Sequence, residues 1–155
     1  MKRPTPPIEW AGDHIRIIDQ TLLPAEVKFI EIRSASQAVD AIQRLAIRGA
    51  PALGAFGSLA LVVALDEIEP ESLSQARTRL EECRTLIGDA RPTAINLRWA
   101  VDRVIDQATK DGSDLTSLRS ALIREAQAVA DEDKAACDEI GRLGHELLRD
   151  ANVIG

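Results

Sequence analysis

Residues 51–67 read PALGAFGSLALVVALDE, and this stretch decides the fold because it is almost entirely alanine, glycine, leucine and valine. A helix without a polar face is normally buried on all sides, so the stretch predicts a central helix from Pro51 to about Glu67. The small residues Gly54 and Gly57 would let neighbouring helices approach it closely. We therefore expect this helix to be the central element of the domain.

A second helix is predicted immediately before the central one. Ser34 and Gln37 form a capping box that starts it. The apolar residues that follow at helical spacing are Ala35, Ala38, Val39, Ile42, Leu45 and Ala46. We expect this helix to end at Arg48-Gly49, because glycine is a frequent C-terminal stop and Pro51 can occupy the first turn of the next helix.

Three further helices are predicted after the central one. They run from about Glu71 to Ile87, from Thr93 to about Thr109, and from Leu115 to Arg149. The last range contains no proline, and its apolar residues recur at helical intervals, among them Leu118, Cys137, Ile140 and Leu147. One continuous helix about 50 Å long is the simplest interpretation.

The first third of the chain has the composition of strands. Ile15–Ile17 and Val27–Ile30 predict short strands, with turn signals at Gly12-Asp13 and Leu23-Pro24. Residues 1–150 are therefore expected to have an α+β fold, a small antiparallel β-meander followed by a bundle of about five helices. The apolar residues 151–155 are again of strand type, and we expect them to begin a second domain.

Composition and charge exclude several classes of protein. The formal net charge is -6, without the basic stripe of a protein that binds nucleic-acid backbones, so we expect no nucleic-acid partner. The N-terminus has no apolar leader, and the longest apolar stretch, Leu59–Leu65, is too short to span a bilayer, so no membrane segment is expected. Two cysteines far apart in sequence favour a reducing compartment, the cytoplasm by default.

Two loops could bind an anion. Arg48 and Gly49 stand immediately before a predicted helix N-terminus, where backbone N–H groups and the helix dipole favour negative charge. Arg91 precedes Pro92 in the same way at the next predicted loop, and Thr93 could cap the helix that follows. Together the loops could hold the phosphate and hydroxyls of one small sugar. The competing interpretation is two ordinary helix-to-helix turns with solvated arginines.

No residue is a good candidate for proton transfer. Cys83 and Cys137 occupy core-like helical positions, where a thiol is inert. His14 is expected in a surface turn and His145 near the end of the long helix. The acidic run 131–133 on the long helix is expected to be a solvated face. The sequence thus predicts no catalytic residue and no metal site in this chain.

The two loop segments resemble the signature stretches of the methylthioribose-1-phosphate isomerases. The similar segments are Ile47–Ala52 and Arg91–Leu97, together with an opening segment, Ile17–Pro24, and Glu139-Ile140-Gly141 with Gly144 near the end of the long helix. The likeness covers essentially the whole chain in the right order and spacing. The same fold is shared by the regulatory subunits of eukaryotic initiation factor 2B and by ribose-1,5-bisphosphate isomerases, which remain as alternatives.

The resemblance implies a function and a division of labour. The family isomerises 5-methylthioribose 1-phosphate to 5-methylthioribulose 1-phosphate in methionine salvage, without a metal or organic cofactor. It implies substrate contacts at Arg48, Gly49, Ala50 and Arg91. It places the catalytic cysteine and aspartate in a C-terminal, Rossmann-like α/β domain that would lie beyond Gly155, and it implies a homodimer at full length.

Three hypotheses follow. The first is that the chain is the N-terminal domain of an isomerase and is inactive alone, which predicts an exposed apolar patch where the second domain would pack. The second is that the chain is a non-catalytic binding module related to the initiation-factor subunits, which predicts a surface that needs no further domain to cover it. The third is that it folds alone and retains weak sugar-phosphate binding through Arg48 and Arg91.

Overall fold

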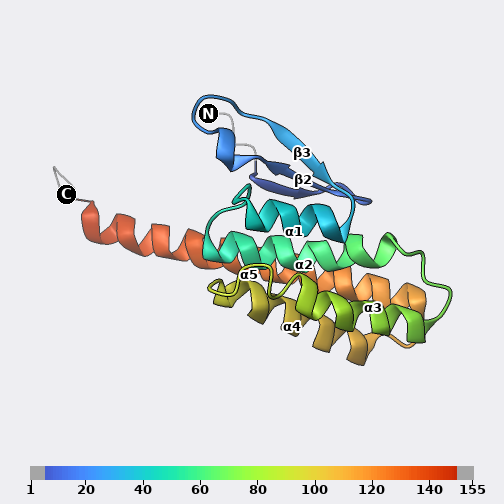
Figure 1. Ribbon diagram of the computed structural model, residues 1–155. Coiled ribbons are helices and arrows are strands. Elements are labelled where there is room, and N and C mark those ends of the chain that lie inside the picture. The colour runs from blue at the N-terminus through green and yellow to red at the C-terminus, as the bar shows by residue number, and fades with distance from the viewer. Residues whose placement is uncertain (1–5, 150–155) are drawn as a thin grey trace.

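The structure, a computed structural model, describes residues 6–149 and has a β-meander followed by a helical bundle (Figure 1). The strands are β1 (Ile8–Trp10), β2 (Ile15–Ile18) and β3 (Phe29–Ile32), with a 3₁₀ turn, η1 (Gln20–Leu22), between the last two. The helices are α1 (Ala35–Gln43), α2 (Ala50–Asp66), α3 (Leu73–Leu86), α4 (Ile95–Asp111) and α5 (Leu115–Leu148). The predicted α+β class is confirmed, whereas the strand expected at residues 151–155 lies outside the described residues.

The three strands form an antiparallel sheet in the order β1-β2-β3. Ile15 pairs with Ile32 and Ile17 with Ile30. Ile15 and Ile17 are fully buried on the face of the sheet that meets the helices. β1 was not predicted, and β3 begins two residues later than expected, at Phe29. Strands this short are ended by backbone pairing rather than by composition.

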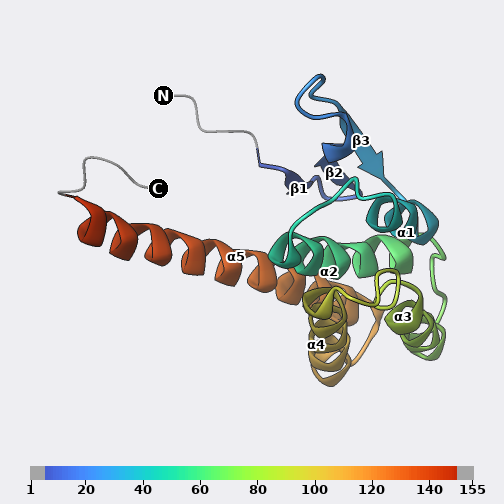
Figure 2. The same cartoon turned by 60° about the vertical axis from the view of Figure 1, so that its left-hand side comes forward.

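Helix α2 is the central element, as its composition predicts. Its residues from Leu53 to Leu65 are all buried. The other four helices and the first two strands all contact it. Figure 2 shows α1 on one side of α2 and α3 and α4 on the other, with α5 crossing beside them. A hydrophobic surface on every side of α2 is therefore matched by a neighbour on every side.

Helix α1 ends five residues earlier than predicted. The N–H of Ala46 donates to the carbonyl of Ala41 at 2.9 Å, and that of Leu45 to Ile42 at 3.2 Å. This pair of bonds is a Schellman motif, and Leu45 takes the left-handed position at φ 64°. Glycine usually fills that position because a leucine there costs about 1–2 kcal/mol. The end of the helix was predicted at Gly49 because glycine is the usual residue at this left-handed position.

Helix α4 begins at Ile95, two residues after the predicted start. The N–H of Ala94 donates to the carbonyl of Arg91 at 2.9 Å, so Pro92 and Thr93 lie in a turn before the helix. Thr93 is not the cap that the sequence predicted, because the N-cap residue is Ala94 and no side chain caps the helix. The starts of α1 and α3 are different, since Ser34 and Ser72 each accept a backbone N–H bond there.

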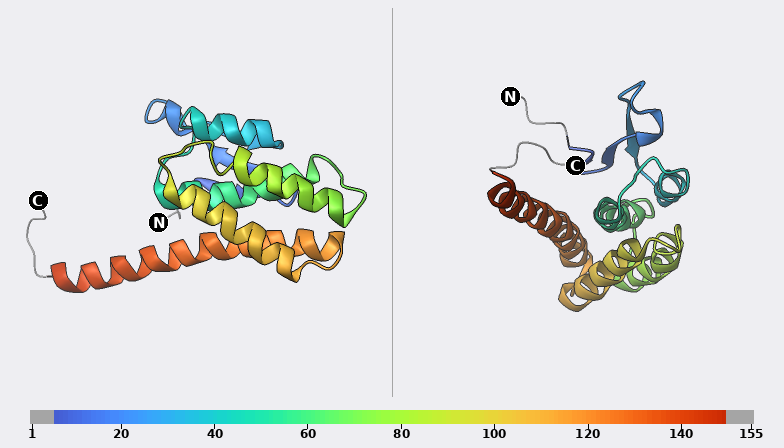
Figure 3. Two further views of the ribbon diagram at one scale, coloured as in Figure 1. Left: turned by 60° about the horizontal axis from the view of Figure 1, so that its bottom comes forward. Right: turned by 90° about the vertical axis from the view of Figure 1, so that its left-hand side faces the viewer.

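Helix α5 is one continuous helix of 34 residues, about 51 Å long, as predicted. Asp114 and Ser117 form a reciprocal capping box at its start. Within the described residues, its last buried side chain is Val129, and beyond it the helix projects past the bundle (Figure 3). The core-like position predicted for Cys137 is therefore wrong, since this cysteine is exposed. Helical spacing of apolar residues predicts a common face, but not that a partner covers it.

Six of the ten large apolar side chains that are exposed in the described chain lie on α4 and on the projecting part of α5. Ile140 is 70% exposed and Leu147 85%, while Ile95 and Trp99 on α4 are 79% and 52% exposed. No helix within residues 6–149 is both long enough and apolar enough to cross a membrane.

Candidate functional site

The two predicted anion-binding loops are brought together in space. The α1–α2 loop leads into α2 and the α3–α4 loop leads into α4, and the two helices begin at the same end of the bundle (Figures 1 and 3). Gly54, in the second turn of α2, lies against the first turn of α4. A Cβ added to Gly54 would be 3.2 Å from the backbone oxygen of Asn96. Glycine at this position therefore permits the close approach of the two helix starts.

The first loop presents Arg48 to solvent. Gly49 is the N-cap of α2 and has φ 100° and ψ 133°, a conformation open to glycine and strained for other residues. No side chain caps this helix, and Pro51 occupies its first turn. Arg48 is exposed and forms no hydrogen bond or ion pair with any residue in the range 6–149. The positive end of the α2 dipole and a free guanidinium thus share one corner.

The second loop places Arg91 farther from the start of its helix than the sequence predicted. Arg91 is partly buried, and its side chain has no hydrogen-bond or ion-pair partner in the described part of the chain. It stands four residues before Ile95 rather than directly before the helix. Asn96, in the first turn of α4, is exposed. The loop still delivers a free cation beside an uncapped helix start.

Helix capping separates these two helices from the rest. The starts of α1, α3 and α5 are capped by the side chains of Ser34, Ser72 and Asp114. Those of α2 and α4 have no side-chain cap. An uncapped N-terminus leaves N–H groups for water or a ligand. The two uncapped helices are in contact between Gly54 and Asn96 and begin at the same end of the bundle, so both leave free donors at that end.

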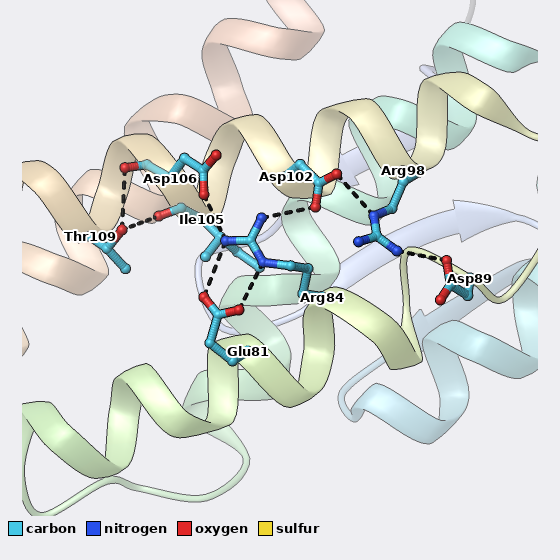
Figure 4. Close-up of polar contacts among 8 residues, drawn as sticks. All are labelled: Glu81, Arg84, Asp89, Arg98, Asp102, Ile105, Asp106 and Thr109. Atoms are coloured by element: carbon cyan, nitrogen blue, oxygen red, sulfur yellow. Dashed lines mark hydrogen bonds and ion pairs between the residues drawn. The ribbon is translucent and has the colours of Figure 1, made fainter.

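An ion-pair network fixes the second loop to α4 (Figure 4). Arg98 donates to Asp89 of the loop at 2.8 Å and to Asp102 at 2.9 Å. Arg84, in the last turn of α3, donates to Asp102 at 2.9 Å and to Asp106 at 2.7 Å. Burial alone would raise the pKa of Asp102, but hydrogen bonds from Arg84 and Arg98 outweigh it and lower this pKa. The carboxylate therefore stays charged and holds both arginines.

A groove of about 650 Å³ borders the start of α2. It runs between β1, α2 and α5. Its apolar lining includes Trp10, Ala52 and Ala130, and its charged lining includes Asp131, Asp133 and Lys134. The acidic run predicted to be a solvated face is thus divided, since Glu132 pairs with Arg103 while its two neighbours line the groove.

The groups capable of proton transfer are not gathered at these loops. Cys83 is buried inside α3, and burial raises the pKa of its thiol to about 11. Cys137 is exposed on the projecting part of α5. His14 is held between Asp13 and Arg33, and His145 lies near the end of α5. Within residues 6–149, no three His, Cys, Asp or Glu side chains are grouped so that they could hold a metal ion.

One buried polar residue was missed by the sequence reasoning. Asp19 is 5% exposed and hydrogen-bonded to Arg44 at 2.6 Å, beside the loop that carries Arg48. The signal was present, because Asp19 directly follows a strand and an aspartate there often accepts the backbone N–H two residues on, as it does from Thr21. The prediction used Asp19 and Gln20 only as part of the segment Ile17–Pro24 that resembles the isomerase family.

Comparisons with known proteins identify relatives along the whole chain. A family model described as the initiation factor 2 subunit family matches residues 46–154. The 5-deoxyribose 1-phosphate isomerase of Moorella thermoacetica is 37% identical over 99% of this chain and 44% of its own length. A methylthioribose-1-phosphate isomerase of Xanthomonas campestris is 41% identical over 92% of this chain and 39% of its own length. The chain thus spans less than half the length of these curated relatives.

Two solved structures share the fold. The translation initiation factor eIF-2B subunit delta of A. fulgidus superposes with a TM-score of 0.76 and 36% identity, over 82% of this chain and 37% of that one. The 5-methylthioribose 1-phosphate isomerase of Pyrococcus horikoshii OT3 superposes with a TM-score of 0.77 and 28% identity, over 81% of this chain and 36% of that one. On the family match, the sequence identities and these superpositions, the chain belongs to the initiation factor 2 subunit family.

Proposed function

We propose that this chain forms the phosphate-binding part of a sugar-phosphate isomerase, with Arg48 and Arg91 as the cations and Gly49 and Ala50 at the substrate. The observation that carries the proposal is the meeting of two uncapped helix N-termini, each preceded by an arginine without a partner in the described residues. A phosphate placed there would receive backbone N–H bonds and two charge-assisted bonds.

The pairing of the other arginines supports this choice. Most arginines of the described chain form ion pairs with carboxylates, namely Arg16, Arg33, Arg44, Arg79, Arg84, Arg98, Arg103, Arg119, Arg124 and Arg142. Arg48 and Arg91 form no such pair within residues 6–149. Neither does Arg77, which donates to the backbone carbonyls of Thr109 and Gly112, nor Arg149 at the C-cap of α5. An arginine already paired with a carboxylate has less of its charge and fewer donors available for a phosphate. Among the arginines without an ion pair, Arg48 and Arg91 are the ones that stand in the loops before the two uncapped helix starts, so they are the better candidate ligands.

The substrate class follows from the relatives' names. The isomerases of Moorella thermoacetica and Xanthomonas campestris are both named for a pentose that carries phosphate at C1. We propose 5-methylthioribose 1-phosphate as the substrate and methionine salvage as the pathway. Isomerisation to 5-methylthioribulose 1-phosphate needs the ring to open before hydrogen moves from C2 to C1. Arginine stays charged at any working pH, so Arg48 and Arg91 would orient and stabilise the substrate rather than move its protons.

The proton-transfer groups would come from a second domain. By the family resemblance this is a Rossmann-like domain that supplies a cysteine and an aspartate, and it needs no cofactor. The apolar surface of Ile140, Leu143 and Leu147 on α5 supports such a domain, because exposed apolar side chains on one helix face usually meet another protein surface. We expect the chain alone to be inactive, and the longer protein to be a cytoplasmic homodimer.

A second candidate function is a non-catalytic subunit of the initiation-factor type. The superposition on eIF-2B subunit delta at 36% identity favours it. That function needs protein contacts and no sugar phosphate at the α2–α4 corner. Binding of a C1-phosphorylated pentose therefore discriminates between the two.

The test is a titration of the chain with 5-methylthioribose 1-phosphate, followed by backbone amide NMR. We expect shifts confined to residues 49–52 and 91–97. Replacing Arg48 or Arg91 with alanine should weaken binding about tenfold or more, since a bond between charged groups contributes about 1.5–3 kcal/mol. Arg142→Ala, on the projecting part of α5, is the matched control and should bind as the wild type does. Unchanged binding in both loop variants would refute the proposed site.

A further inference from the structure

The residues that follow β2 hold the loop that carries Arg48. The carboxylate of Asp19 has only 8% of its side chain exposed. It accepts hydrogen bonds from the backbone N–H of Thr21 at 3.1 Å, the hydroxyl of Thr21 at 2.6 Å and Nη1 of Arg44 at 2.6 Å. A buried carboxylate with three donors is held in one orientation.

Arg44 is fixed at both of its bonded ends. It is the C-cap residue of α1, and its Nε donates to Asp40 of the same helix at 2.9 Å. Its Nη1 reaches across to Asp19 on the sheet side. The guanidinium therefore joins the last turn of α1 to the end of β2. A lysine could keep the charge but could not make both bonds with one planar group.

The backbone of the same segment holds the loop a second time. The N–H of Gln20 donates to the carbonyl of Ala46 at 3.0 Å, and that of Asp19 to Lys28 at 2.9 Å. Leu45 lies between the two attachment points, Arg44 and Ala46, in its left-handed conformation. A strained residue persists where the surrounding contacts determine it, and here contacts exist on both of its sides.

Only three residues separate this attachment from the start of α2. Ala46 and Ile47 are fully buried, and Arg48 and Gly49 follow directly. The direction in which Arg48 leaves the core is therefore set at Leu45 and Ala46. We propose that Asp19 and Arg44 are positioning residues that fix the Arg48–Gly49 segment at the start of α2. The inference rests on the proposed function in one respect, that Arg48 is a phosphate ligand.

The competing explanation is an ion pair that only stabilises the packing of the sheet on α1. The chain offers a matched control for it. Asp66 and Arg119 form a pair at 2.7 Å between α2 and α5, at the opposite end of α2 from Gly49. Asp66→Asn should weaken this pair without touching the loop. The Asp66 side chain is 30% exposed against 8% for Asp19, so each variant is compared well below its own unfolding midpoint and the control shows the effect of lost stability alone.

The experiment compares Asp19→Asn, Arg44→Ala, Arg44→Lys and Asp66→Asn with the wild type, well below their unfolding midpoints. Amide hydrogen exchange at Gln20 and Ala46 reports on the loop without ligand, and the Kd for 5-methylthioribose 1-phosphate reports on the site. We expect Asp19→Asn and Arg44→Ala to exchange about tenfold faster at both amides and to bind about tenfold more weakly. Arg44→Lys should restore part of both losses, which keeps the test valid if one of the other variants fails to fold.

Two outcomes would overturn the inference. In the first, Asp19→Asn lowers the unfolding midpoint as Asp66→Asn does, yet leaves the Gln20 and Ala46 exchange rates at their wild-type values. In the second, exchange quickens but the Kd stays the same. If the wild type binds no sugar phosphate, the proposed function fails, and the exchange rates still decide whether Asp19 and Arg44 fix the loop.

Discussion

Replacing Gly54 with alanine tests the contact that brings α2 and α4 together. In an open helix position this change would stabilise the protein by about 1 kcal/mol through helix propensity. Here the new Cβ would lie 3.2 Å from the backbone oxygen of Asn96 and 3.4 Å from the Cβ of Ala100, so α4 must move by a few tenths of an ångström. Overpacking of this kind costs about 1–3 kcal/mol. The two effects leave a net loss of about 1 kcal/mol.

Thermal unfolding is the first assay for this variant. A loss of about 1 kcal/mol should lower the midpoint by about 2–4 °C in a chain of this size. Sugar-phosphate binding should also weaken, because the start of α4 is displaced from that of α2. Gly144→Ala is the control, since nothing lies within 4 Å of its added Cβ. It should slow amide exchange in the last turns of α5. A higher midpoint for Gly54→Ala would refute the close contact.

Three further predictions concern groups away from the loops. Iodoacetamide at about pH 8 should alkylate Cys137 and leave Cys83 unmodified in the native chain, as measured by peptide mass spectrometry. The reason is that only the Cys137 thiol is exposed, while burial raises the pKa of the Cys83 thiol to about 11. Equal labelling of the two cysteines would contradict the buried position of Cys83. Asp102→Asn should lower the free energy of unfolding measured in urea at neutral pH. The difference in this free energy from the wild type should shrink as the pH falls below about 4, because the lowered pKa of Asp102 gives stability only while the carboxylate is ionised. A constant difference would mean that its charge is not used. Phe56→Ala should lower the free energy of unfolding measured in urea by about 3–5 kcal/mol, since this side chain is fully buried in the centre of α2. A loss below about 1 kcal/mol would mean that the neighbouring side chains fill the space left by the ring.

The central helix could be predicted from sequence because its signal is local. Leu53 to Leu65 needs burial on every side wherever the neighbours come from, and the structure provides it. The long α5 was equally clear, since thirty-four residues without proline at helical spacing have few other conformations. Capping was predicted in part: Ser34 caps α1, but Gln37 accepts the N–H of Arg33 rather than that of Ser34, so the predicted capping box is only half formed.

The errors arose where a distant contact decides the local structure. Leu45 adopts a glycine-like conformation because a Schellman motif and the bonds around Asp19 determine it, and nothing in the local composition indicates this. Cys137 and Ile140 are spaced like core residues, yet no neighbour reaches that part of α5 in the described chain. The closeness of the two arginine loops is also non-local. It depends on Gly54 meeting Asn96, forty-two positions away in the sequence.

The charge distribution explains how an acidic chain could still select a phosphate. The net charge of -6 gives a negative field at long range, which is screened within about 8–10 Å at physiological salt. Inside that distance the two helix dipoles and the unpaired Arg48 and Arg91 dominate. An extended polyanion would meet the negative surface over its whole length, whereas one phosphate monoester would meet only the local positive corner. The proposed site should therefore favour a small sugar phosphate over nucleic acid, and pairing either arginine with a carboxylate would remove that preference.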